Sequence, residues 1–269
     1  LLFHGVILAP FRAQDIDPNQ MPADAAILAT QQPCNNCPIR YRAVCAHCES
    51  EELDELEGTK FYRRYEAGQT IVWAGDRMDF LASVVAGMAG LTQQLEDGRT
   101  QMVGLLLPSD FLGRPGREQA AYTVTATSDL LLCCFRRKPF EELLRSTPRI
   151  AGRLLEMTLD ELDAARDWLL LLGRKSAREK IASLLVILAR REAALLRRRP
   201  EGRIIVNLPL TREAMADYLG LTLETVSRQM SALKRDGVII LDGKRHVTIP
   251  DLERLMEEAG DDSDGGVPE

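Results

Sequence analysis

The hydrophobic pattern of this chain of 269 residues changes sharply near its midpoint. Residues 62–135 form short apolar runs separated by glycines, whereas residues 139–172 follow the three- and four-residue spacing of amphipathic helices. Short strands with glycine turns are typical of an antiparallel barrel or jelly roll. We therefore predict an α+β protein that begins with an antiparallel β-roll (jelly roll) and continues as helices.

Six runs of about six residues predict the strands of the roll. They span residues 69–74, 82–86, 90–95, 101–107, 121–126 and 130–135. Glu96-Asp97-Gly98, between two of these runs, is typical of a hairpin turn. A short acidic helix is expected at residues 49–58, so residues 34–146 are predicted to form one sensor domain. Residues 1–33 are rich in Pro, Ala and Gln, which predicts a disordered arm.

A long helix is predicted over residues 147–173, and it carries two apolar stripes. One stripe must pack on its own domain and the other on something else, for which a second copy of the chain is the simplest partner. Burial of both stripes within one chain is the alternative. We assign the dimer interface to the first stripe, which comprises Leu154, Met157, Glu161, Ala164, Trp168 and Leu171. The second stripe comprises Leu155, Leu159, Leu162 and Leu169.

The formal net charge of −6 averages two unlike parts of the chain. Residues 174–250 hold 16 Lys and Arg against 8 Asp and Glu, so the rest of the chain is strongly acidic. A basic module on an acidic chain favours a polyanionic partner, although a solvated basic surface is the alternative. We expect the basic domain to span residues 174–257, followed by a disordered tail at 258–269.

Two short capped helices stand in this basic domain. Thr211 and Thr222 are predicted N-caps, and Gly220 ends the first helix. This arrangement is typical of a helix-turn-helix, although two capped helices can also form the corner of a bundle. In the second helix, residues 223–236, the buried face is expected to comprise Leu223, Val226, Met230 and Leu233. The exposed face, suited to reading base edges of double-stranded DNA, comprises Glu224, Thr225, Ser227 and Arg228.

A hairpin is expected after these helices, over residues 237–249 with its turn at Asp242-Gly243. Lys244 and Arg245 follow the turn, and we expect them to contact phosphates. The sequence thus predicts a winged helix-turn-helix.

Four of the six cysteines, Cys34, Cys37, Cys45 and Cys48, lie within 15 residues. No secretory signal or membrane-spanning run of ~18–20 apolar residues is apparent, so we expect a cytoplasmic protein with no membrane partner and metal-binding thiols. Four thiolates suffice for a closed zinc site. However, only seven residues separate the two pairs, fewer than the ~12–20 that are common in such sites. An iron–sulfur cluster also uses four thiolates. Three alternatives are therefore left by the cysteine pattern: an iron–sulfur cluster, a zinc ion, and a protein without metal.

Glu224-Thr225-Val226-Ser227-Arg228 resembles the Glu-x-x-Ser-Arg recognition motif of the CRP/FNR transcription regulators. The resemblance covers residues 34 to about 257. Within the family, the sequence is most similar to the FNR branch. It implies a β-roll sensor, a dimerisation helix and a winged helix, in the order derived above. It also implies a homodimer that binds inverted repeats of TTGAT-type half-sites and contacts RNA polymerase, for which the exposed 96–100 hairpin is a candidate.

The FNR resemblance also implies a ligand set. Cys34, Cys37 and Cys45 match the C-x2-C-x7-C spacing of one FNR sub-branch. Alignment on the following Phe-Arg-Arg makes Cys133 the fourth ligand, while Cys134 becomes a small buried residue. Cys48 is then a spare thiol or an alternative ligand. By this resemblance the cofactor is a [4Fe-4S] cluster that favours the dimer and that oxygen converts to [2Fe-2S], weakening dimerisation and DNA binding.

Cyclic nucleotide binding is not expected. The family's nucleotide-binding members offer a Gly-Glu pair and an Arg-Ser/Thr pair, but here Arg114 follows Gly113 and no Arg precedes a Ser or Thr near Tyr122. An enzyme is not expected either. The histidines are scattered and no catalytic triad, phosphate-binding loop or dinucleotide motif is present.

Overall fold

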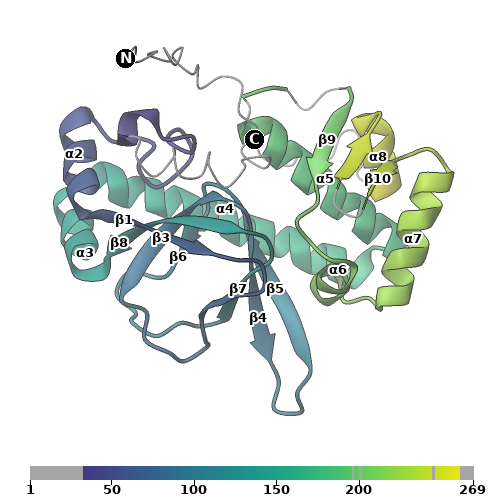
Figure 1. Ribbon diagram of the computed structural model, residues 1–269, viewed down its shortest axis with the longest axis horizontal. Helices are drawn as coiled ribbons and strands as arrows, with labels where there is room; N and C mark the ends of the chain where they lie inside the picture. Colours follow the sequence, from purple (N-terminus) through teal and green to yellow (C-terminus); the bar gives the residue numbers. More distant parts are fainter. Residues whose placement is uncertain (1–32, 196, 200–201, 244–245, 261–269) are drawn as a thin grey trace, which may run out of the picture.

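The computed structural model describes residues 33–195, 197–199, 202–243 and 246–260. Within them, the long helix α4 (Pro148–Arg174) joins the β-roll to the helix-turn-helix domain, as Figure 1 shows; we keep the names sensor domain and DNA-binding domain from the sequence prediction. The α+β class and the predicted order of β-roll, long helix and helix-turn-helix are confirmed. The predicted arm and tail lie almost wholly outside the described residues. None of the helices described is long and apolar enough to span a membrane.

Two antiparallel sheets make up the sensor domain. The first has the order β1 (Lys60–Tyr65), β8 (Leu130–Arg136), β3 (Phe80–Ala86), β6 (Phe111–Leu112). The second has the order β2 (Thr70–Val72), β7 (Thr123–Ala126), β4 (Ala89–Gln94), β5 (Thr100–Leu106). Apolar side chains of both sheets meet in one core, which we call the inter-sheet core. The roll therefore closes around its own hydrophobic interior, as the alternating runs require.

The six predicted strands correspond to β2, β3, β4, β5, β7 and β8, whereas β1 and β6 were not predicted. The apolar pattern of the sequence did not predict β1, because Lys60, Arg63 and Arg64 make half of this strand charged. In the structure the Arg63 guanidinium lies 4.4 Å from the centre of the Phe80 ring. This cation–π contact allows a charged side chain to pack against a residue of the inter-sheet core. Strand β6 is only two residues long and has no pattern to detect.

The outer face of the first sheet is covered by the N-terminal segment. It starts with the short 3-10 helix η1 (Cys34–Asn36) and continues through turns to α2 (Ser50–Thr59). Glu52 accepts a hydrogen bond from the Glu49 backbone N–H, which closes a capping box at the start of α2. Together with α3 (Arg137–Ser146) and the first turns of α4, these elements bury a second core, here called the thiol core.

The DNA-binding domain begins with α5 (Ala177–Leu195) and β9 (Ile204–Asn207). The helices α6 (Arg212–Leu219) and α7 (Leu223–Arg235) follow, then the hairpin of β10 (Ile240–Asp242) and β11 (His246–Ile249), which extends a sheet with β9. The final helix, α8 (Leu252–Ala259), was not predicted and runs two residues past the expected domain end. Arg178 of α5 fixes α8 through a two-pronged ion pair with Glu258, at 2.6 and 2.9 Å.

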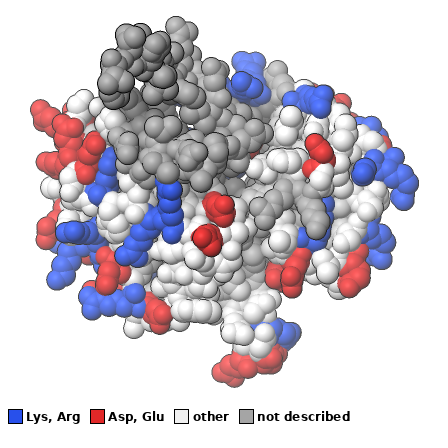
Figure 2. Space-filling view, in the orientation of Figure 1, with Lys and Arg blue, Asp and Glu red and all other residues white. Residues whose placement is uncertain are grey.

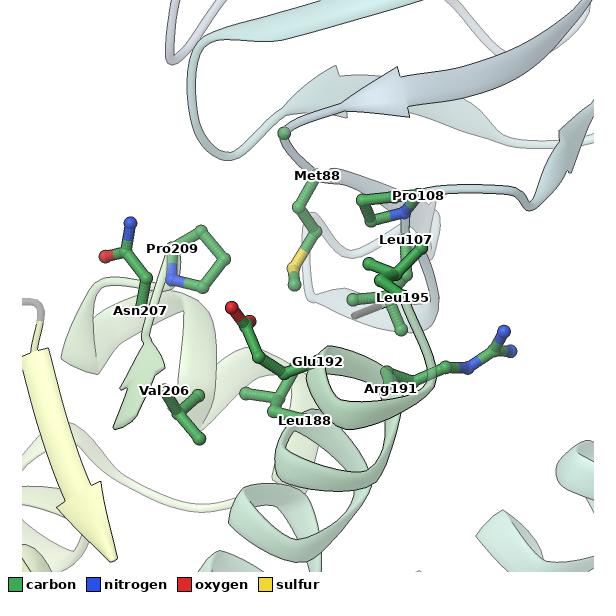
Figure 3. Close-up of a pocket in the computed structure, with 11 residues that line it drawn as sticks. Met88, Leu107, Pro108, Leu188, Arg191, Glu192, Leu195, Val206, Asn207 and Pro209 are labelled. Carbon is green, nitrogen blue, oxygen red and sulfur yellow. The ribbon is translucent and has the colours of Figure 1, made fainter. Parts of the chain in front are cut away.

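The two domains are in close contact. The cavity at their junction has a volume of only about 20 Å3 and is lined by Met88 and Leu107 from the sensor and by Leu188 of α5, among others (Figure 3). Beside it, Arg191 reaches Asp110 of the sensor at 3.3 Å. Further along, the Gln101 side-chain amide donates a hydrogen bond of 2.6 Å to the Asp217 carbonyl of α6.

The assignment of the two stripes on α4 was wrong. Trp168 of the first stripe stacks on Tyr218 of α6, with ring centroids 3.9 Å apart, and Leu171 is buried in the core of the DNA-binding domain. Leu154 and Met157 pack on the thiol core of the same chain, and Glu161 lines a cavity in the sensor domain. Glu161 and Ala164 are the members of the predicted set that are exposed in the single chain.

The second stripe is the one that faces solvent. Its four leucines are 46% to 71% exposed, together with the neighbouring Leu170 at 59%. Periodicity identified both faces of α4, but it carried no information on which face meets the chain's own domains. The apolar surface available for a partner is therefore Leu155, Leu159, Leu162 and Leu169.

Candidate functional site

Cysteines from two distant parts of the chain meet in the thiol core. Cys34, Cys37 and Cys45 come from the turns before α2, and Cys133 comes from the middle of β8. The thiols of the three N-terminal residues all act electrostatically on Cys133. All six cysteines of the chain are free thiols. The four residues expected as ligands thus lie together, although Cys133 follows Cys45, the nearest of the others in sequence, by 88 residues.

Cys133 and Cys134 point to opposite faces of β8, as alternation along a strand requires. Cys133 pairs with Tyr62 and belongs to the thiol core, whereas Cys134 pairs with Phe61 and belongs to the inter-sheet core. Cys134 is fully buried there, among apolar side chains. Only Cys133 faces the N-terminal thiols.

Burial keeps these thiols protonated in the absence of a ligand. It raises the pKa of Cys45 to about 12 and the pKa of Cys133 well above its ordinary value. It also raises the pKa of Cys34 and Cys37. A thiol must lose its proton to bind a metal, so metal binding at this site would release protons and replace the buried neutral groups with a charge-compensated centre.

Arg40 shapes the turn that presents the N-terminal thiols. Its guanidinium donates hydrogen bonds of 2.6 to 2.7 Å to the backbone carbonyls of Cys45, Ala46 and Cys48. One side chain therefore satisfies three carbonyl groups and fixes the path of the chain between the two cysteine pairs. Sequence reasoning did not identify Arg40, because its role depends on backbone groups that carry no sequence signal.

Cys48 is also buried, but it lies toward α2. After burial, which raises its pKa to about 11, the groups that act most strongly on its thiol are Glu52 and Arg40. Cys48 belongs to the same thiol core and interacts electrostatically with Cys34 and Cys45, so its role as a spare thiol or an alternative ligand stays a prediction.

The donor set consists of thiols, which are ligands for zinc as well as for an iron–sulfur cluster. Among the described residues, no three His, Cys, Asp or Glu side chains converge on a position for one metal ion. A cubane iron–sulfur cluster bonds each thiolate to a different iron, so its ligands stand around the cluster instead of at one point. The thiol core holds five thiols from two segments, Cys34, Cys37, Cys45 and Cys48 before α2 and Cys133 on β8, so ligands for such a cluster are available there.

The helix-turn-helix has the capping that its sequence predicts. The Thr211 hydroxyl accepts a hydrogen bond from the Ala214 N–H at the start of α6, and Thr222 does the same for Thr225 at the start of α7. Between the two helices Gly220 adopts a left-handed conformation with φ of 62°. A side chain at this position would be strained, which explains why glycine forms the turn.

Helix α7 lies at the outer edge of the molecule (Figure 1), and the exposed residues in its N-terminal half are mainly polar. Glu224, Ser227 and Arg228 are exposed, while Thr225 is half-buried. Hydrogen bonds from its own backbone N–H and from Thr222 lower the pKa of the Glu224 carboxyl. Glu224 and Arg228 are four residues apart on α7 and therefore lie on the same face of the helix.

One predicted member of the buried face of α7 is exposed, and two predicted phosphate contacts cannot be compared with the structure. Val226, Met230 and Leu233 form the buried face of α7 as predicted, but Leu223 is 46% exposed because it occupies the first turn. Lys244 and Arg245, the expected phosphate contacts of the wing, lie outside the described residues.

A further cavity of about 240 Å3 lies inside the roll. It is lined by apolar residues together with Arg114, Arg117 and Arg137. The Arg137 guanidinium is already engaged, because it donates to the Met78 and Arg114 carbonyls and to Glu141.

Comparison with known families agrees with both domains. Residues 62–147 match the cyclic nucleotide-binding domain, and residues 179–258 match the Crp-like helix-turn-helix domain. With this order of domains, the chain belongs to the CRP/FNR family of DNA-binding transcription regulators.

Individual relatives are similar over most of their length. The transcriptional activator protein FnrL of Cereibacter sphaeroides is 72% identical over 235 residues, which cover 87% of this chain and 95% of that protein. The fumarate and nitrate reduction regulatory protein of Escherichia coli is 27% identical over 230 residues, 84% and 90% of the two chains. The structure of FixK2 from Bradyrhizobium japonicum superposes with a TM-score of 0.65 and 31% identity, covering 74% of this chain and 96% of that one. The first two of these relatives are named as a transcriptional activator and a regulatory protein.

Arg228→Ala should weaken binding to a specific DNA site by about 1–3 kcal/mol and relax the preference at one base pair, because a guanidinium on a base edge discriminates between bases. Titration of labelled duplexes with single base changes measures both effects. Arg235→Ala is the control, because Arg235 is exposed at the opposite end of α7. Equal weakening of all sequences by Arg228→Ala would make it a phosphate contact instead.

Proposed function

We propose that this chain is an oxygen-responsive, dimeric transcription regulator whose [4Fe-4S] cluster is held by Cys34, Cys37, Cys45 and Cys133. The observation that carries the proposal is the meeting of Cys34, Cys37 and Cys45 with the β8 thiol of Cys133 in a single apolar core, which also contains Cys48. In this proposal an intact cluster favours the dimer, and oxygen converts it to a [2Fe-2S] form that weakens the dimer. The similarity to FnrL supports a role in transcriptional activation.

Zinc is the alternative that the cysteine spacing left open. A structural zinc site draws four ligands to one tetrahedral point, and the two N-terminal pairs alone would provide them. That arrangement gives no reason for Cys133 to face the same core, yet it does so while Cys134 faces away. This distribution supports a centre that spans the N-terminal segment and the sheet.

Contacts from the cysteine segment to α4 support the link between cluster and dimer. Arg153 of α4 donates a hydrogen bond of 2.8 Å to the Arg42 carbonyl, three residues before Cys45. One turn earlier, Arg149 forms ion pairs with Glu49 and Glu52 at the start of α2. A change in the cysteine segment therefore acts directly on the first half of α4.

The exposed stripe on α4 supports a two-fold helical interface. Leu155, Leu159, Leu162, Arg166 and Leu169 are separated alternately by four and three residues, which is the core spacing of a two-stranded coiled coil. The single polar member, Arg166, pairs with Asp163 at 2.8 Å in its own helix. A polar group in such a seam weakens association, so the dimer would be sensitive to small changes in α4.

A dimer presents two recognition helices to the two halves of an inverted repeat. We infer TTGAT-type half-sites, read by Glu224, Ser227 and Arg228 with help from Thr225, and phosphate contacts by Lys244 and Arg245. Loss of the dimer halves the phosphate contacts and therefore lowers DNA affinity sharply.

The β4–β5 hairpin is the proposed contact with RNA polymerase. It projects from the body of the sensor (Figure 1), and its tip gathers acidic and basic side chains at the lower edge of Figure 2. Glu96, Asp97 and Arg99 are exposed there, with Arg99 bonded to Asp97 at 2.8 Å.

We also infer that the cavity in the roll binds no cyclic nucleotide. Arg137 is engaged with protein groups, and the Gly-Glu and Arg-Ser/Thr pairs expected for a cyclic phosphate are missing from the sequence around Gly113 and Tyr122.

Cys133→Ser should abolish cluster assembly, because it removes the only β8 thiol that faces the N-terminal cysteines. Cys134→Ser is the matched control and should keep the cluster, since its side chain lies on the other face of the strand. Iron, sulfide and visible absorption per chain after anaerobic purification measure the outcome. A colourless wild-type protein with stoichiometric zinc would overturn the oxygen-sensor proposal.

Leu162→Glu should raise the dimer dissociation constant at least about hundredfold, because a leucine is lost from each side of the seam. Arg166→Leu should have the opposite effect and hold the dimer together in air, because it makes the seam uniformly apolar. Sedimentation of anaerobic and aerated samples measures both. An unchanged dimer in Leu162→Glu would exclude this face of α4 as the interface.

A further inference from the structure

A buried cation lies beside the thiols. Lys60 is the first residue of β1, and its side chain is only 9% exposed. Its ammonium group donates a hydrogen bond of 3.3 Å to the sulfur of Cys34. Lysine is rarely buried without a charged or hydrogen-bonding partner, so the position of this side chain requires a reason.

Glu57, at the end of α2, completes a three-residue arrangement. One carboxylate oxygen lies 3.5 Å from the Lys60 amine, and the other accepts a hydrogen bond of 3.0 Å from the Cys34 backbone N–H. Lys60 and Glu57 therefore hold Cys34 at its sulfur and at its backbone. Glu57 is 39% exposed, so water screens its negative charge more than the positive charge of Lys60.

The charge of Lys60 also acts on other thiols of the group. Burial raises the pKa of Cys34, Cys37 and Cys133, and the positive charge of Lys60 acts to lower the pKa of all three. Tyr62, two residues along β1 and on the same face, has its ring centre 5.6 Å from the Lys60 amine and pairs with Cys133. The amine thus faces the space between the N-terminal segment and β8.

We propose that Lys60 is a positioning residue that protects the bound cluster from oxidation through its positive charge. The inference rests on the proposed [4Fe-4S] function. Four thiolates outweigh the positive charge of the cluster core, so the complete centre is an anion. When O2 takes one electron from the centre and becomes superoxide, the centre loses one unit of negative charge. A cation in hydrogen-bond contact with a ligand sulfur stabilises the more negative form and therefore slows this step.

Glu57 sets the strength of this protection. Its carboxylate partly neutralises Lys60, so the pair determines how much positive charge the centre experiences. The two residues have opposite signs, and neutralising each in turn must change the oxygen reaction in opposite directions.

The test uses the full chain, purified anaerobically and then mixed with air-saturated buffer while its visible absorption is followed. Lys60→Met should bleach about tenfold faster than wild type, which is ~1.4 kcal/mol in the barrier. Lys60→Arg keeps the charge and should stay within about twofold of wild type. Glu57→Gln, whose amide oxygen can still accept from the Cys34 N–H, should bleach about twofold more slowly.

Arg64→Met is the matched control, because it removes a positive charge from the same strand at an exposed position. It should bleach at the wild-type rate. Iron and sulfide content before mixing provides a second measurement. If Lys60→Met assembles no cluster while Lys60→Arg does, Glu57→Gln decides: slower bleaching than wild type supports the inference, and an unchanged rate overturns it.

If Lys60→Met and Lys60→Arg behave alike, whether both resemble wild type or both lose the cluster, the charge is not the cause and the inference is overturned. The proposed function fails separately, through a wild-type protein that carries no iron–sulfur cluster.

Discussion

The alternation of side chains along β8 is the constraint on which the rest of the structure depends. Because β8 pairs with β1 in a fixed register, Cys133 faces the N-terminal thiols and Cys134 faces the inter-sheet core. A slip of one residue would exchange the two and place a different thiol in each core. The sheet therefore determines which cysteine can join the N-terminal segment, and that segment closes the thiol core over it.

Helix α4 extends this constraint to the rest of the molecule. Its first turns pack on the thiol core and bond to the cysteine segment, while Trp168 and Leu171 near its end pack on the DNA-binding domain. The same helix leaves a leucine stripe exposed. In the proposed function, one rigid element thus connects the cluster, the dimer seam and the spacing of the two recognition helices. The regulator then needs no ligand in the roll, whose cavity contains an already engaged Arg137.

Local patterns predicted much of this arrangement, because glycine turns, strand alternation and helix caps depend on neighbouring residues. The strands of the roll and the capped helices of the helix-turn-helix were found in this way. The stripe of α4 was assigned to the wrong side, since Trp168 contacts Tyr218 far away in the sequence. Lys60 had no sequence signal for the same reason, because its partner Cys34 lies 26 residues earlier.

Native mass spectrometry of the anaerobic wild-type protein, before and after exposure to air, tests the central claim most directly because it reports metal content and assembly together. The account predicts a dimer with one [4Fe-4S] cluster on each chain, which loses iron in air and separates into monomers. A chain that carries one zinc ion, or a dimer that persists unchanged after the cluster is lost, would contradict it.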